Sequence, residues 1–341
     1  MTRPPLTSRV LWRCALIVLT AAAGAGLLTA CGDDAPSNPA SMFSGTYSAT
    51  RTTTSVDGTP TTGIDATPQT STWIVQTSCA GPGSGCVAVA SSTTADPSLA
   101  YDQQRMDFVF ENGTWSRVVV PPTRPCVPQG LSAPIDEPWV AIDSASMRAN
   151  DSASRLSGTL ASVQGGSCAM TSEGTITLAR TGGLPSGTKK LGDVRVPAAV
   201  ASPVDGFRGT YEETTTIVAW NPPTLIRTPT VQTTRFTASP TCTRDGTTCA
   251  VVMRDQGSQD ASPTVAGFTG GPSRMLSQVE TVGPRRCSDG RSYRPVLTST
   301  ATLPDGAASP VQTISSTSTL AWSEACPGRV TFENDLRRIG D

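Results

Sequence analysis

The sequence predicts an all-β protein of two tandem homologous antiparallel domains, each with about eight strands closed as a barrel or packed as a sandwich and with two disulfides. Three observations support this expectation. Threonine, serine, glycine and proline recur throughout, and no long stretch has apolar residues at helical spacing. Short alternating apolar and polar segments lie between turn residues, a pattern that favours strands. An opening motif and four cysteines also occur twice in the same order.

The internal repeat is the clearest feature of the chain. A Phe-x-Gly-Thr-Tyr motif opens each copy, at Phe43–Tyr47 and at Phe207–Tyr211, and an aromatic residue, Trp73 or Phe236, lies six positions before the first cysteine. Successive cysteines are 7, 40 and 42 positions apart in the first copy and 7, 38 and 39 apart in the second. Two units of this length are tandem domains rather than a solenoid.

The domain boundaries follow from the repeat and from the segments rich in glycine, proline and small polar residues, which are typical of linkers. In the first domain, Asn112-Gly113 is the strongest hairpin signal. In the first domain we expect strands over residues 45–54, 70–77, 86–90, 105–110, 114–120, 138–142, 156–163 and 175–179. The predicted segments are a leader over 1–30, a flexible tether over 31–42, β domains over 43–180 and 207–341, and a linker over 181–206.

The N-terminus has the layout of a bacterial export signal. Three arginines precede an uncharged apolar run from Cys14 to Leu28, which is shorter than the ~20 residues that span a bilayer. The Leu28-Thr29-Ala30-Cys31 block resembles a lipobox. The resemblance implies that Cys31 becomes the first residue and carries a diacylglyceryl thioether and an N-acyl chain such as palmitate. Two or three acyl chains anchor a protein stably. We therefore expect attachment to the cell membrane on its extracytoplasmic side.

Eight further cysteines follow Cys31, and an exported chain meets an oxidising environment in which disulfides persist. If each copy closes on itself, the simplest arrangement joins the first cysteine to the second and the third to the fourth. We interpret these bonds as structural, because the spacing lacks the Cys-x-x-Cys of redox sites and the close thiolate pairs of zinc sites. The predicted pairs are Cys79–Cys86, Cys126–Cys168, Cys242–Cys249 and Cys287–Cys326.

Composition narrows the possible functions. The chain contains no histidine, which excludes Ser-His-Asp and Cys-His catalysis, histidine-ligated zinc and imidazole pH sensing. Loss of the leader with its three arginines changes the formal net charge from −1 to −4. No basic stretch interleaved with aromatic residues is present, so we expect no nucleic-acid partner. Nothing in the sequence indicates a metal or cofactor.

Only weak candidates for a functional site remain. Asp136-Glu137 and Glu212-Glu213 are acidic pairs, but glycoside hydrolysis needs opposed carboxyl groups in a cleft, so we interpret both pairs as solvated charge. Trp220 precedes Asn221-Pro222-Pro223 and would be the first place to look for an exposed contact surface. Arg285-Arg286, beside Cys287, is interpreted as a solvated turn.

The whole-chain pattern resembles the uncharacterised lipoproteins of mycobacteria and related actinomycetes. The resemblance rests on the lipobox at 28–31, the two aromatic motifs and the eight spaced cysteines. It implies an envelope location with the domains outside the cytoplasmic membrane. It supplies no substrate and no catalytic residues.

The sequence therefore favours a non-catalytic envelope protein that binds an unknown envelope protein or ligand, since rigid β scaffolds suit binding loops. One alternative is a carrier that holds a small apolar ligand inside a barrel. Another is a carboxylate-based hydrolase of envelope glycans. An apolar cavity would favour the carrier. Opposed carboxylates in a cleft would favour the hydrolase, and a filled core would favour binding through surface loops.

Overall fold

The computed structural model describes residues 43–81, 84–93, 105–121, 140–149, 154–189, 191, 196, 198–221, 231–257, 263–269, 274–280, 285–286, 290, 292–293, 295–303, 310–322 and 328–341. The predicted leader, Cys31 and tether lie outside these residues. Within them, no helix has both the length and the apolar character that crossing a membrane requires.

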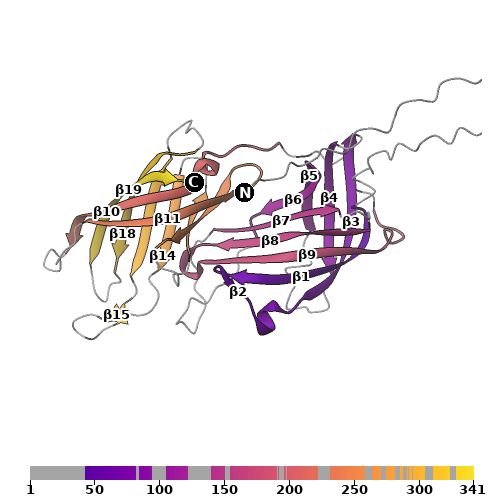
Figure 1. Cartoon of the computed structure of the whole chain (residues 1–341), viewed down its shortest axis with the longest axis horizontal. Coiled ribbons are helices and arrows are strands. Elements are labelled where there is room, and N and C mark those ends of the chain that lie inside the picture. Colours follow the sequence, from indigo (N-terminus) through magenta and orange to yellow (C-terminus); the bar gives the residue numbers. More distant parts are fainter. Residues whose placement is uncertain are drawn as a thin grey trace, which may run out of the picture. The chain divides into compact units, whose positions relative to one another are not determined.

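The all-β prediction is confirmed: the strands form two large antiparallel sheets (Figure 1). The first sheet contains nine strands in the order β2-β1-β3-β4-β5-β6-β7-β8-β9, and β1 also pairs with β9. This pairing closes the sheet on itself. Its strands are β1 (Gly45–Val56), β2 (Thr59–Pro60), β3 (Gln69–Gly81), β4 (Ser84–Thr93), β5 (Arg105–Glu111), β6 (Thr114–Val119), β7 (Ala141–Ala149), β8 (Arg155–Gln164) and β9 (Met170–Gly182).

The second sheet is a closed barrel of eight strands, β10-β11-β12-β13-β14-β17-β18-β19, and β15 pairs with β16 as a separate ribbon. The same chain order of neighbours therefore recurs in both halves. The strands are β10 (Gly209–Asn221), β11 (Val231–Cys242), β12 (Thr248–Asp255), β13 (Thr264–Thr269), β14 (Arg274–Glu280), β15 (Arg285–Arg286), β16 (Ser292–Tyr293), β17 (Val296–Thr302), β18 (Thr313–Ala321) and β19 (Arg329–Gly340).

Alternating burial explains why these Thr-rich segments form strands. In β1 the buried positions are every second residue from Gly45 to Ala49, while threonine and serine occupy the half-exposed positions between them. Successive side chains of a strand point to opposite faces, so one face of β1 enters the core. The first core contains eight aromatic or sulfur-bearing side chains among its buried members: Phe43, Tyr47, Trp73, Cys86, Met106, Phe108, Trp115 and Met147.

The repeated opening motif forms one end of each core. Phe43 and Tyr47 are fully buried with ring centroids 5.8 Å apart, and Phe207 and Tyr211 repeat the contact at 4.9 Å. The intervening glycine has a φ of +134° at Gly45, in a region that side-chain-bearing residues rarely adopt. The motif is therefore a structural signature of sheet closure and marks no reactive group.

Two of the predicted disulfides are confirmed. Cys79 bonds Cys86 across β3 and β4, and Cys242 bonds Cys249 across β11 and β12, each pair lying directly opposite in the strand register. Cys168 is also disulfide-bonded. Its predicted partner Cys126, and the predicted pair of Cys287 and Cys326, lie outside the described residues.

One strand was predicted in the wrong place. The expected strand over 138–142 is instead β7, which begins at Ala141 and continues to Ala149. The segment Asp143-Ser144-Ala145-Ser146 lacks large apolar residues, so the sequence gives no alternating signal there. Pairing with β6 on one side and β8 on the other nevertheless holds it in the sheet.

Candidate functional site

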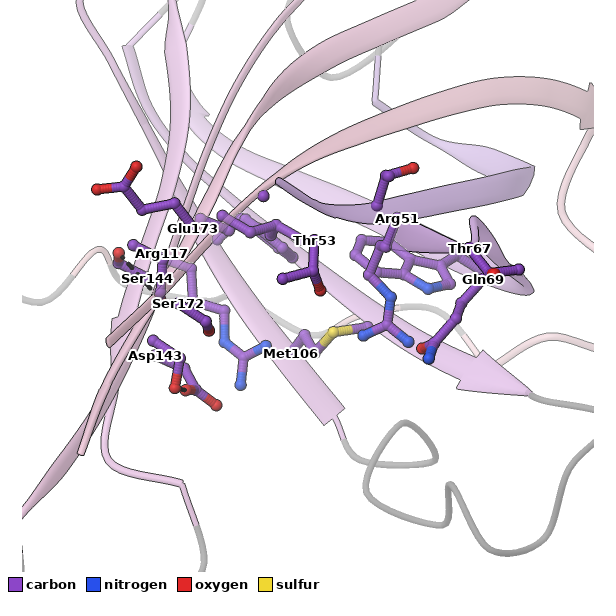
Figure 2. A pocket seen from close by; sticks show the side chains of 18 residues that line it. Arg51, Thr53, Thr67, Gln69, Met106, Arg117, Asp143, Ser144, Ser172 and Glu173 are labelled. Carbon is purple, nitrogen blue, oxygen red and sulfur yellow. Dashed lines mark hydrogen bonds between the residues drawn. The ribbon is translucent and has the colours of Figure 1, made fainter. Parts of the chain in front are cut away.

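A cavity of about 220 Å³ lies inside the first sheet and has two chemically different sides. Trp73, Met106 and Phe108, all nearly fully buried, form its apolar wall. Arg51, Arg117 and Asp143 are among its polar lining (Figure 2). The cavity is thus neither the continuous apolar space expected of a lipid carrier nor a fully packed core.

Neighbouring aromatic rings hold the apolar wall in place. The Trp73 and Phe108 rings are tilted against each other with centroids 6.0 Å apart. The indole Nε1 of Trp73 donates a hydrogen bond to the Ser71 hydroxyl at 3.1 Å, which satisfies the buried N–H group. The ring is therefore fixed and can offer a preformed surface to a ligand.

Small inward residues leave the space open. Ala145 on β7 lies at the cavity, and so does Gly174 on β9. A Cβ atom at Gly174 would come within 2.6 Å of the Thr52 carbonyl oxygen, so glycine permits the close approach of β1 and β9 there. Beside it, the pairing of β1 with β9 shifts register between Thr53 and Ser55, a bulge that bends the strand.

The polar side of the cavity comes from several strands. Arg51 belongs to β1, Arg117 to β6 and Asp143 to β7. The Ser162 hydroxyl on β8 donates a hydrogen bond of 2.7 Å to Oδ1 of Asp143. The three charged residues also interact with other groups of the chain, so they are held within the protein rather than loose.

Only one of the two carboxylates at the cavity points into it. Figure 2 shows the Asp143 side chain directed inward and the Glu173 side chain directed away. Glu173 is exposed and accepts a hydrogen bond from the Ser55 hydroxyl at 3.3 Å. Opposed carboxyl groups, which a glycan hydrolase requires, are not formed by the residues that line this cavity.

The Glu212-Glu213 pair is divided between two environments, and its interpretation as solvated charge is wrong for Glu213. Adjacent residues of a strand face opposite sides. Glu212 lies outside and accepts hydrogen bonds from Arg235 at 2.9 and 3.0 Å. Glu213 faces inward, where the Thr234 hydroxyl donates to it at 3.4 Å. Hydrogen bonding to Arg235 lowers the pKa of Glu212, whereas burial raises the pKa of Glu213.

A hydrogen-bonded polar network lies inside the second barrel. The amide of Asn334 donates to the hydroxyl oxygens of Ser316 and Ser318 at 3.1 and 2.8 Å, and Ser318 lies 2.7 Å from the Ser299 hydroxyl. Such satisfied buried groups rigidify a core. The two copies therefore share strand order and differ in their interiors.

Burial of Glu213 makes the stability of the protein depend on pH. Because its folded-state pKa is raised, its contribution to stability is fully present below the ordinary pKa of 4.5 and is lost as the pH rises through the folded-state value. We expect Glu213→Gln to melt at a higher temperature than the parent at pH 7, with the difference shrinking below pH 4.5. Thermal unfolding followed by circular dichroism across this range measures both effects.

Glu212→Gln is the matched control, since its carboxyl pKa is lowered by the neighbouring arginines. That substitution should leave the melting temperature at pH 7 unchanged or slightly reduced. Equal responses of the two variants at pH 7 would contradict the assignment of Glu213 to the interior.

The remaining sequence candidates form no site among the residues that the structure describes. Trp220 is half-buried, with its ring centroid 6.0 Å from that of Trp322, so its ring does not offer a fully exposed contact surface. The backbone of Arg285 and Arg286 forms β15. Asp136 and Glu137 lie outside the described residues. Among those described, no group of three or more cysteine, aspartate or glutamate side chains is placed to hold a metal ion.

Comparisons with known proteins assign no family to the chain. No family model matches it, and no curated protein matches it. Among solved structures it is similar to the sensor domain of PknI from M. tuberculosis, with 17% identity, coverage of 43% of this chain and 92% of that chain, and a TM-score of 0.31. It is also similar to a protein of unknown function of the DUF3598 family from Nostoc punctiforme, with 10% identity, coverage of 88% and 98%, and a TM-score of 0.21. A putative AttH from Nitrosomonas europaea has 8% identity, coverage of 85% and 92%, and a TM-score of 0.17.

Proposed function

We propose that the protein is a non-catalytic lipoprotein of the cell envelope whose first β domain binds a small amphipathic molecule. The observation that carries this proposal is the cavity of about 220 Å³ inside the first sheet, with Trp73, Met106 and Phe108 on one side and charged and hydroxyl groups on the other. Ligand sites combine an apolar lining with a few placed polar groups that orient the ligand. The volume is below the ~300–1,000 Å³ typical of drug-sized ligands, which favours a small molecule.

Membrane attachment is the second part of the proposal and rests on the N-terminal sequence. The lipobox-like block ends at Cys31, and eleven residues separate that cysteine from Phe43, the first buried aromatic residue of the first core. The Gly, Asp, Ser and Pro residues between them suit a flexible tether. A tethered binding domain would sample ligands close to the membrane surface.

Cys31→Ala tests the anchor. The variant should lose thioether acylation, and most of the protein should move from the membrane fraction to the supernatant of fractionated host cells, measured by immunoblot. Cys14→Ala, within the apolar run of the leader, is the matched control and should remain in the membrane fraction. Continued processing and membrane retention of Cys31→Ala would contradict the lipobox assignment.

Native mass spectrometry tests the ligand site. The chain from residue 32 onward contains every described residue and can be secreted by its host and purified gently. We expect a reproducible extra mass that is lost on denaturation. An apoprotein mass, unchanged after incubation with an extract of the host envelope, would contradict a cavity ligand.

Filling the cavity should remove that extra mass. Ala145→Trp would place an indole in the space that Ala145 lines, and Leu160→Trp provides a second, independent block. Val218→Trp is the control, because Val218 is 46% exposed on β10 and does not line the cavity. Circular dichroism verifies that each variant is folded. Retention of the mass by folded cavity variants would place the ligand elsewhere.

A further inference from the structure

The two arginines of the cavity come from strands on opposite sides of the ring, β1 and β6. Around the ring of eight strands in the first sheet, β1 and β6 are four positions apart in both directions. Arg51 lies four residues after the buried Tyr47 on β1, and Arg117 lies two residues after the buried Trp115 on β6. Residues at even spacing share a strand face, so both side chains point inward. Figure 2 shows both guanidinium groups extending into the same space.

The inward-pointing charges do not balance. Asp143 is the one lining carboxylate that points inward, against the two guanidinium groups of Arg51 and Arg117. The β6–β7 register pairs Arg117 with Ala145 and Val119 with Asp143, which makes Arg117 and Asp143 diagonal neighbours on one face. The formal charge of the cavity is therefore +1. Charges interact more strongly where water is scarce, so an anion that enters would be stabilised.

The apolar wall of the cavity specifies the rest of the ligand. Trp73 is 2% exposed, Met106 6% and Phe108 0%, and none of them offers a charge. Guanidinium groups bind carboxylates through paired, charge-assisted hydrogen bonds. One water molecule occupies ~30 Å³ in the liquid, so the cavity of about 220 Å³ has the volume of roughly seven water molecules. A compact molecule with an apolar body and one anionic group fits this size and polarity.

The second barrel shows that sheet closure does not require these arginines. The aromatic motifs place Thr215 at the position of Arg51, since each lies four residues after the motif tyrosine. The strand register likewise places Ser277 where the first sheet has Arg117. Both replacements are uncharged, and the second barrel closes nonetheless. The arginines are therefore a property of this cavity and not of the repeated fold.

We infer that the ligand of the first domain is a small organic monocarboxylate, with its carboxylate held between Arg51 and Arg117 and its apolar body against Trp73, Met106 and Phe108. This inference rests on the proposed function, since it names the class of molecule that the cavity takes. Asp143, held by Ser162, limits the excess charge to one and so favours a single carboxylate over a dianion.

A matched ligand series tests the charge preference. Benzoate, phenylacetate and hexanoate are titrated calorimetrically into the chain from residue 32 onward, beside their neutral amides. At least one carboxylate should bind tenfold or more tightly than its amide, because a hydrogen bond to a charged group contributes ~1.5–3 kcal/mol and ~1.4 kcal/mol is a factor of ten. Phenyl phosphate, as the dianion, should bind more weakly than phenylacetate.

Variants connect the preference to the two arginines. Arg51→Gln and Arg117→Gln should each weaken carboxylate binding about tenfold and leave amide binding unchanged. Arg105→Gln is the control, because Arg105 is 61% exposed and pairs with Asp107 at 2.9 Å on β5, and it should bind like the parent. Thermal unfolding confirms that each variant is folded.

The outcomes separate the inference from the proposed function. Equal binding of carboxylates and amides, unaffected by either arginine substitution, would overturn the inference while supporting a cavity ligand. If none of these probes binds and the native protein releases a neutral or cationic molecule, the inference is likewise overturned and a cavity ligand is still supported. Failure of all probes together with an apoprotein mass would overturn both.

Discussion

Gly158→Val is expected to abolish cooperative folding of the first sheet or to reduce its stability by about 3 kcal/mol or more. Gly158 lies on β8 opposite Met147 of β7. A Cβ atom there would overlap the carbonyl group of Ser146 and lie 2.8 Å from the Cα of Met147. These are backbone atoms, which cannot rotate aside as a side chain would. Urea unfolding monitored by tryptophan fluorescence measures the loss.

Gly182→Ala is the matched control for this substitution. Gly182 also lies in a strand of the first sheet, β9, but a Cβ atom added there meets no atom within 4 Å. Its replacement should change stability by less than about 0.5 kcal/mol, as is usual for surface positions. If Gly158→Val unfolded at the same urea concentration as Gly182→Ala, the close β7–β8 approach would be incorrect.

Trp115→Ala should cost about 3–5 kcal/mol, the range for removal of a large buried aromatic side chain. Trp115 is 1% exposed, and its ring centroid lies 5.0 Å from those of Phe43 and Phe110. Loss of the indole would leave a cavity, and the aromatic rings of β5 and of the opening motif would surround it. Equilibrium denaturation in urea, analysed for the first transition, gives the free-energy change.

Trp322→Ala serves as the comparison, since Trp322 is only half-buried and belongs to the second half of the chain. We expect a loss of about 1 kcal/mol, close to the centre of the distribution for point substitutions. The Trp115→Ala variant should also weaken binding of carboxylate probes less than Arg117→Gln does, provided that it is folded. A cost below 1 kcal/mol for Trp115→Ala would contradict its place in the core.

The fold class and two hairpin disulfides could be predicted because each produces a local signal in the sequence. The spacing of Cys79 from Cys86 matches a hairpin, and the repeat supplies the same spacing at Cys242 and Cys249. The exact course of β7 could not be predicted, because its inward and outward positions both carry small residues. Barrel closure could not be predicted either, since pairing of the first and last strands depends on the whole chain.

The cavity was missed for a related reason. Arg51 and Arg117 are separated in sequence and meet only because β1 and β6 lie on opposite sides of the closed ring. A partial signal was nevertheless present: Arg117 has the same strand parity as Trp115, and a charged residue on an apolar face is unusual. The same parity argument distinguishes Glu213, which lies inside with Tyr211, from the neighbouring Glu212.

The pairing of β1 with β9 and of β10 with β19 has a consequence for biogenesis. In each half the first strand pairs with the last, so one edge of the first strand stays unpaired until almost the entire half has been synthesised. Non-local pairing of this kind slows folding and exposes edges that aggregate. Because the first half precedes the second in the chain, β1 can pair with β9 before the second half has been synthesised. The growing chain would then present two successive short-lived open sheets rather than one long one, which limits the time for which unpaired strand edges are exposed.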